Sequence, residues 1–225
     1  HVIPESVAQT AAYLQSRGKR DGIHAFIDFG AGTTDVNILD LRNSRLRGAL
    51  PKPHWYAAKN LPRGTHYIEE IIHQWRKKKK MKTNAAAILE DIRMLKGGPD
   101  DLRKEVTAEL NKVWVQSRAS WASAYKYFKQ EKYWMADRVT VYVGGGGALN
   151  PLVPDVFKKS WMKGWGPYKV EDIPVPADFD KDAGAPFSRM SVAYGLTFPE
   201  PELAKFSLPS EQRDRTPRRK RMHCH

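Results

Sequence analysis

The pattern of hydrophobic and polar positions predicts a chain in which strands and helices are interspersed. Short apolar runs predict buried strands, at residues 25–27, 36–39, 139–143 and 170–175. Apolar side chains that recur every three or four residues predict helices, at residues 2–14, 65–76, 84–96, 100–130 and 187–198. Residues 40–47 are predicted to form a second hairpin with a basic turn. Residues 48–64 contain three prolines and are predicted to form an irregular connection.

A turn rich in glycine and threonine lies between the first two predicted strands. Its sequence is Asp-Phe-Gly-Ala-Gly-Thr-Thr-Asp, at residues 28–35. Because glycine lets another group approach the backbone closely, this turn would offer amide N–H groups and two hydroxyl groups to an anion. Asp28, at the end of a buried strand, supplies the hard oxygen that Mg²⁺ prefers. The turn suits a magnesium-bound polyphosphate, and a plain β-hairpin with surface threonines is the alternative.

A second glycine-rich turn follows the strand predicted at 139–143. Four glycines, Gly144–Gly147, stand between this strand and an apolar segment that begins Ala-Leu-Asn-Pro. Asn150 is predicted to be the N-cap of a helix, with Pro151 as its first residue. A helix N-terminus favours phosphate, so this turn too permits the close approach of a flat or anionic ligand.

Two segments in the first part of the chain resemble motifs of one superfamily. Residues 28–35 resemble the second phosphate motif, Asp-x-Gly-x-Gly-Thr-Thr/Phe-Asp, of the actin, Hsp70 and sugar-kinase superfamily. Residues 2–14 are similar to the first connecting motif of Hsp70 proteins, with Pro4 in place of Asn and Ser6 in place of Pro. Glu5 falls on the glutamate of that motif.

Two later segments follow in the order that this superfamily implies. Residues 143–153 are similar to its adenosine motif, an apolar strand followed by glycines and a helix. Residues 187–198 resemble its second connecting motif, Ala-x-Ala-x-Gly. Ser191, Ala193 and Gly195 would supply the small residues where this helix crosses the first connecting helix.

The resemblance, closest to Hsp70-like (DnaK-like) proteins, implies an α/β fold, the C-terminal lobe of an actin-like ATPase. Such a ribonuclease H-like lobe is a mixed sheet flanked by helices, with a small, mostly helical subdomain. The implied core covers 1–47 and 101–198, the inserted helical subdomain covers 48–100, and 199–225 form a basic, proline-containing tail. Only Gly-Gly-Pro separates two predicted helices where Hsp70 proteins carry a β-hairpin region, so the upper part of the lobe is expected to be reduced.

The same resemblance implies Mg²⁺ and ATP or ADP as cofactors, and specific residues as their contacts. Asp28 would hold Mg²⁺ through water, and Glu5 would orient the attacking water. The residues implied to bind the β- and γ-phosphates are Gly30, Ala31, Gly32, Thr33 and Thr34. The residues implied to lie along the adenosine and α-phosphate are Gly144, Gly145, Gly146, Gly147 and Asn150.

Glu90 and Arg93 match a Glu-x-x-Lys on the family's adenosine helix, with Arg in place of Lys. Residues three positions apart share one edge of a helix, so an exposed ion pair is the alternative reading.

The function implied is a chaperone-like hydrolase lobe that uses Mg-ATP to drive a conformational change in a partner or client. Hydrolysis is expected only when the lobe is joined to an N-terminal lobe, whose phosphate loop and neighbouring lysine this chain lacks. One alternative is a catalytically weak scaffold or filament subunit in a nucleic-acid-associated complex. A small-molecule kinase of the same fold is a third.

Charge and composition bear on partners and location. The 38 Lys and Arg against 25 Asp and Glu give a formal net charge of +13, which favours an acidic partner such as nucleic acid. The lysine run 77–80 is either such a patch or a solvated helix end. No apolar run is long enough for a membrane span. The single cysteine, Cys224, cannot form an internal disulfide, so a cytoplasmic protein is expected.

Adjacent His223, Cys224 and His225 cannot easily turn toward one ion, so a zinc site is not favoured there. The chain begins with His, not Met, so we expect a fragment or a processed chain, and a segment missing after Lys80 is an open alternative.

Overall fold

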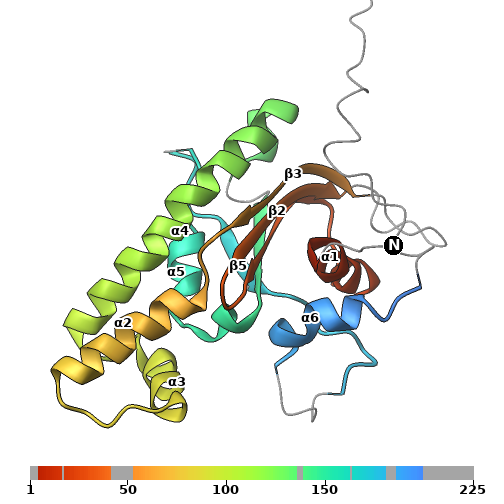
Figure 1. Ribbon diagram of the computed structural model, residues 1–225. Coiled ribbons are helices and arrows are strands. Elements are labelled where there is room, and N and C mark those ends of the chain that lie inside the picture. Colours follow the sequence, from red (N-terminus) through yellow and green to blue (C-terminus); the bar gives the residue numbers. More distant parts are fainter. Residues whose placement is uncertain are drawn as a thin grey trace, which may run out of the picture.

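The central feature of the fold is a five-stranded mixed sheet (Figure 1). The computed structural model describes residues 5–16, 18–41, 53–135, 139–162, 164–180 and 186–199. The strands are β1 (Gly22–Phe29), β2 (Thr34–Leu41), β3 (His54–Leu61), β4 (Val139–Gly144) and β5 (Lys169–Asp172), in the order β3-β2-β1-β4-β5. Only β2 runs opposite to the others, because β1–β2 and β2–β3 are antiparallel while β1–β4 and β4–β5 are parallel. This is the ribonuclease H-like arrangement, and the predicted fold class is confirmed.

Helices cover both faces of this sheet. They are α1 (Glu5–Gln15), α2 (Thr65–Lys78), α3 (Ala85–Met94), α4 (Asp100–Tyr127), α5 (Val153–Phe157) and α6 (Phe187–Gly195), with short 3₁₀ turns at Glu131–Tyr133 and Gly146–Leu149. One core cluster joins a face of the sheet to α2, α4 and α5. A second joins the other face to α1 and α6 (Figure 1). Strand residues alternate between these clusters, as in Ile27 on the first and Phe26 on the second.

The irregular connection predicted at 48–64 is wrong for part of its length, because His54–Leu61 forms β3 and pairs with β2. Pro53 and Pro62 flank this strand and do not interrupt it. The stretch 48–100, expected to form an inserted helical subdomain, therefore contributes a strand to the central sheet as well as α2 and α3.

The helices α1 and α6 cross on one face of the sheet, where the two connecting motifs were expected to meet. Ser191 and Gly195 are buried. Ala193 is exposed, contrary to expectation, because a helix turns about 100° per residue and places it on the opposite side of the axis from Ser191 and Gly195.

Three predictions fall on residues that the structure does not describe. They are the basic turn within 40–47, the tail beyond 199 and the unfavoured zinc position at 223–225. None of the helices in the described ranges combines the length and apolar character needed to cross a membrane.

Candidate functional site

The two predicted glycine-rich turns lie side by side at the carboxyl ends of β1 and β4. These strands are parallel neighbours, and Asp28 pairs with Gly144 at the end of the register. In the sheet, β1 has β2 as its other neighbour, and β4 has β5 on the opposite side. The chain therefore leaves β1 and β4 in opposite directions across the sheet. In open α/β sheets, ligands bind in the crevice outside the carboxyl ends of strands at such a switch point.

The turn after β1 is fixed on the start of α2. Within the turn, the Gly30 amide donates to the Thr33 carbonyl at 3.0 Å. The carbonyls of Gly30 and Ala31 accept from the amides of Thr65 (2.9 Å) and His66 (2.8 Å). Two amide groups of the first turn of α2 are therefore used to hold this loop and are not offered to a ligand.

Thr34 has a structural role, since its hydroxyl donates to the Arg63 carbonyl at 2.6 Å and its side chain is buried. The neighbouring Gly64 lies so close to the turn that a Cβ there would overlap the Ala31 carbonyl oxygen. Thr33 and Gly32 are exposed, with open space beside the Gly32 backbone. The outer part of the turn, at Gly32 and Thr33, is therefore the part that is accessible to a ligand.

The turn after β4 interlocks with the first. Gly145 has φ +77°, and a Cβ there would overlap an Asp28 carboxylate oxygen and lie 2.6 Å from the Phe29 carbonyl oxygen. A Cβ at Gly147 would overlap the Phe29 ring. The Gly145 amide donates to the Ser188 carbonyl of α6 at 2.8 Å. Glycine is thus needed here for close approach as well as for the backbone conformation.

The helix predicted to begin at Asn150 begins later. Asn150 has an extended backbone, and its Oδ1 accepts from the Leu152 amide at 3.0 Å, which closes a side-chain turn. The helix α5 starts at Val153 and has only five residues. Its N-terminus therefore supplies less of the predicted favourable potential for phosphate.

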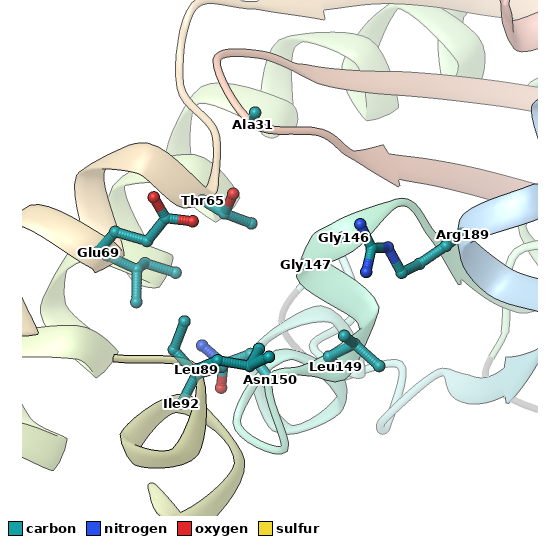
Figure 2. A pocket seen from close by; sticks show the side chains of 11 residues that line it. Ala31, Thr65, Glu69, Leu89, Ile92, Gly146, Gly147, Leu149, Asn150 and Arg189 are labelled. Carbon is teal, nitrogen blue, oxygen red and sulfur yellow. The ribbon is translucent and has the colours of Figure 1, made fainter. Parts of the chain in front are cut away.

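A cavity of about 360 Å³ opens beside these turns (Figure 2). It is lined by Ala31, Thr65, Ile68, Glu69, Leu89, Ile92, Gly146, Gly147, Leu149, Asn150 and Arg189. The volume lies in the range of small-molecule sites, roughly 300–1,000 Å³. Apolar side chains from α2 and α3 face the glycine turn across it, with a few polar groups among them.

Apart from Glu5 at the start of α1, the predicted site residues divide into three groups by position. Those that line the cavity are Ala31, Gly146, Gly147 and Asn150. Those that lie in the adjoining turns are Asp28, Gly30, Gly32, Thr33, Thr34, Gly144 and Gly145. Glu90 and Arg93 are not among the lining residues; they form an exposed ion pair at 4.0 Å, while Leu89 and Ile92 of the same helix face the cavity.

Glu69 and Arg189 line the cavity and were missed by the sequence prediction. Glu69 gives no local signal, because a charged residue on an amphipathic helix is ordinarily part of its solvated face. A weak signal existed for Arg189, since a cation in the first turn of a helix opposes the helix dipole.

Asp28 has an unusual electrostatic environment. Its side chain is almost fully buried, and burial, followed by the negative charges of Asp35 and Glu5, raises its pKa to about 6. Glu5 itself is exposed at the first residue of α1. A carboxylate that is buried close to two others favours a divalent cation, since such an ion would relieve both the burial and the repulsion.

The carboxylate oxygens of Asp28 are donors of the kind that Mg²⁺ prefers. Within the described ranges there is no group of three or more His, Cys, Asp or Glu side chains able to hold a metal ion. Mg²⁺ usually keeps several waters and takes one or two carboxylates together with substrate phosphates. A single carboxylate such as Asp28 suits that mode of binding.

No family model matches the chain, and no curated protein matches it significantly. Solved structures do match it. One is the crystal structure of ethanolamine utilization protein EutJ from Carboxydothermus hydrogenoformans, at 18% identity and a TM-score of 0.48, covering 86% of this chain and 54% of that one. Another is the PilM-PilN type IV pilus biogenesis complex, at 16% identity and a TM-score of 0.49, covering 91% and 52%. The chain spans about half the length of either structure.

Proposed function

We propose that this chain is the nucleotide-binding lobe of an actin-like ATPase and that it binds Mg-ATP between its two glycine-rich turns. The observation that carries the proposal is the contact between these turns at the switch point of the sheet. Two segments more than a hundred residues apart are held so closely that Gly145 has no room for a Cβ beside Asp28. A cavity of nucleoside size opens next to them.

The proposed binding mode runs from the cavity to Asp28. The base and ribose would occupy the space between Leu89 and Leu149 (Figure 2). The phosphates would pass Gly146 and the exposed part of the turn at Gly32. Bound Mg²⁺ would neutralise phosphate charge beside Asp28, which would hold it through water.

We further propose that Glu5 orients the attacking water in hydrolysis, as the resemblance implies. Its charge already acts on the Asp28 carboxyl, so the two side chains belong to one electrostatic site. Because phosphoryl transfer depends mostly on positioning and charge stabilisation, turnover is proposed only for the chain joined to an N-terminal lobe.

The output proposed is a conformational change in a protein partner or client. The crossing of α1 and α6 supports this proposal. The helix α1 carries Glu5, and the Ser188 carbonyl of α6 accepts a hydrogen bond from the Gly145 amide. One helix of the crossing therefore carries a charge that acts on Asp28, and the other is hydrogen-bonded to the glycine turn.

A second candidate is a scaffold with little hydrolysis in a nucleic-acid-associated complex. It is favoured by an exposed cluster at the end of α2, formed by Lys77, Lys78, Lys80 and Lys82. Lys79 of the same run lies 3.3 Å from Asp101. Binding of a duplex that weakens steeply with salt, together with unmeasurable ATP binding, would favour this candidate.

The test is binding of a fluorescent ATP analogue with and without Mg²⁺, to the wild type and three variants. Asp28→Asn keeps the shape of the side chain and removes its charge, so magnesium-dependent binding should be lost. Gly147→Ala puts a Cβ into the Phe29 ring and should also abolish binding.

Gly97→Ala is the matched control, because a Cβ at Gly97 meets nothing within 4 Å and Gly97 does not line the cavity. It should remain folded and bind the analogue as the wild type does. Binding that is absent in the wild type, or unchanged in Asp28→Asn, would contradict the proposal.

A further inference from the structure

Arg189 brings a positive charge into the cavity from a helix that the sequence did not associate with ligand binding. It is the third residue of α6 and is exposed. Figure 2 shows its guanidinium beside Gly146, on the opposite side of the cavity from Glu69 and Leu89. Among the described residues, no carboxylate lies within ion-pair distance of it.

The position of Arg189 is unfavourable for the helix itself. A cation in the first turn of a helix meets the positive end of the helix dipole, so this side chain contributes nothing to the stability of α6 through that interaction. The backbone beside it is nevertheless fixed, because the Ser188 carbonyl accepts from the Gly145 amide at 2.8 Å. The backbone of α6 therefore places beside the glycine turn a guanidinium that has no carboxylate partner among the described residues.

We propose that Arg189 binds the phosphate chain of the nucleotide, and this inference rests on the proposed function. A guanidinium presents a planar fork of donors that matches phosphate oxygens and stays charged at all physiological pH values. The two charged residues of the cavity also set the direction of the ligand. Arg189 holds the phosphates on the Gly146 side, and the Glu69 carboxylate is left facing the base, where it can accept from an exocyclic amine.

The experiment compares ligands that differ only in their phosphates. Adenosine, ADP, ATP and inorganic tripolyphosphate are titrated into the wild type, Arg189→Gln and Arg189→Lys by calorimetry at fixed salt. Arg118→Gln, on the exposed side of α4, is the control for the change in net charge.

Arg189→Gln should weaken the binding of ATP about tenfold, the size expected for the loss of one charge-assisted hydrogen bond. It should weaken the binding of ADP less. It should leave the affinity for adenosine unchanged. Arg189→Lys should retain part of the affinity, since it keeps the charge but loses the fork. Arg118→Gln should match the wild type.

The outcomes separate this inference from the function on which it rests. ATP binding that is equal in Arg189→Gln and the wild type overturns the role of Arg189 and leaves nucleotide binding intact. An equal loss for adenosine and ATP also overturns it, since that result indicates a structural effect. A third outcome is that the chain binds tripolyphosphate through Arg189 without binding ATP. That result would support the phosphate site at Arg189 and contradict the proposed nucleotide binding.

Discussion

Gly195 of α6 lies directly against the backbone of Ala8 in α1, with no room for a side chain between them. A Cβ at Gly195 would overlap the Ala8 carbonyl oxygen and lie 2.9 Å from the Ala8 Cα. Ser191, one turn earlier on α6, is fully buried as well. The two helices therefore cross through their smallest residues, and this crossing joins the segments that carry Glu5 and Ser188.

Gly195→Ala should destabilise the fold, although alanine is normally the better helix former. Overpacking of a tight contact costs roughly 1–3 kcal/mol, because the helices must separate. For a chain of this size that lowers Tm by several degrees, at about 2–4 °C per kcal/mol. Thermal unfolding followed by circular dichroism measures the effect.

The control for this change is Gly97→Ala, since a Cβ at Gly97 meets nothing within 4 Å. Its Tm should stay close to that of the wild type. Equal Tm values for Gly195→Ala and Gly97→Ala would show that the crossing tolerates a methyl group.

Asp28 makes stability depend on pH in a predictable direction. Its pKa is about 6 in the folded protein, against 3.8 as its ordinary value, so between these pH values the folded state holds a proton that the unfolded state has lost. The free energy of unfolding from this group therefore rises as pH falls from 6 toward 4. Above pH 6 the buried charge costs on the order of 2–3 kcal/mol.

Asp28→Asn removes this cost, so without ligand the variant should be more stable than the wild type at pH 7. The two should converge near pH 4. Urea unfolding across this pH range tests the prediction, and a difference that does not change with pH would contradict it. Mg²⁺-dependent nucleotide binding by the wild type should strengthen as pH rises through 6, because the metal requires the ionised carboxylate.

His24 should give the opposite pH dependence. It is buried beside Tyr13, and burial lowers its pKa. Its Nε2 lies 2.7 Å from the Arg20 carbonyl, to which it donates as the neutral tautomer. The unfolded chain takes up a proton near pH 6.5 that the folded protein resists, so stability is present above that pH and is lost as pH falls below it.

His24→Phe would fill the same aromatic cluster without a titrating group. Its free energy of unfolding should fall less than that of the wild type between pH 7 and pH 5, although the Arg20 carbonyl loses a partner. The readout is the slope against pH, not the stability at one pH. Parallel curves for the two proteins would show that His24 does not titrate differently in the folded state.

The sequence predicted the strands next to the site better than the edge of the sheet. The β1 and β4 positions were evident because both strands are apolar runs that end at glycines. β3 was missed because prolines dominate its surroundings, yet His54–Leu61 itself contains none. The prolines mark the limits of the strand, since an N–H is lost only where pairing ends.

Residues of the cavity were less predictable than the turns. Gly145 and Gly147 belong to a motif that is contiguous in sequence. Arg189 and Leu89 reach the cavity only because α6 and α3 pack around it, which no local pattern specifies. The prediction that Glu90 and Arg93 bind the ligand identified the correct helix, α3. These two residues, however, lie on its exposed edge and not on the edge that faces the cavity.

Asn150 should contact the nucleoside, because one half of its side chain is free. Asn150 is almost fully buried, and its Oδ1 accepts from the Leu152 amide at 3.0 Å. Its Nδ2 is buried without a hydrogen-bond partner among the described residues, at the edge of the cavity (Figure 2). A buried unpaired donor costs roughly 1–3 kcal/mol, which a base or ribose acceptor would recover on binding.

Asn150→Asp keeps the acceptor for Leu152 and removes the donor, so it tests the free half alone. Adenosine affinity should fall about tenfold, the size of one lost hydrogen bond in a buried site. Adenosine is the informative ligand, because the new carboxylate would also repel phosphate and add a second effect to ADP and ATP. A melting curve establishes that the variant is folded, and adenosine affinity equal to the wild type in a folded variant would show that Nδ2 makes no contact with the nucleoside.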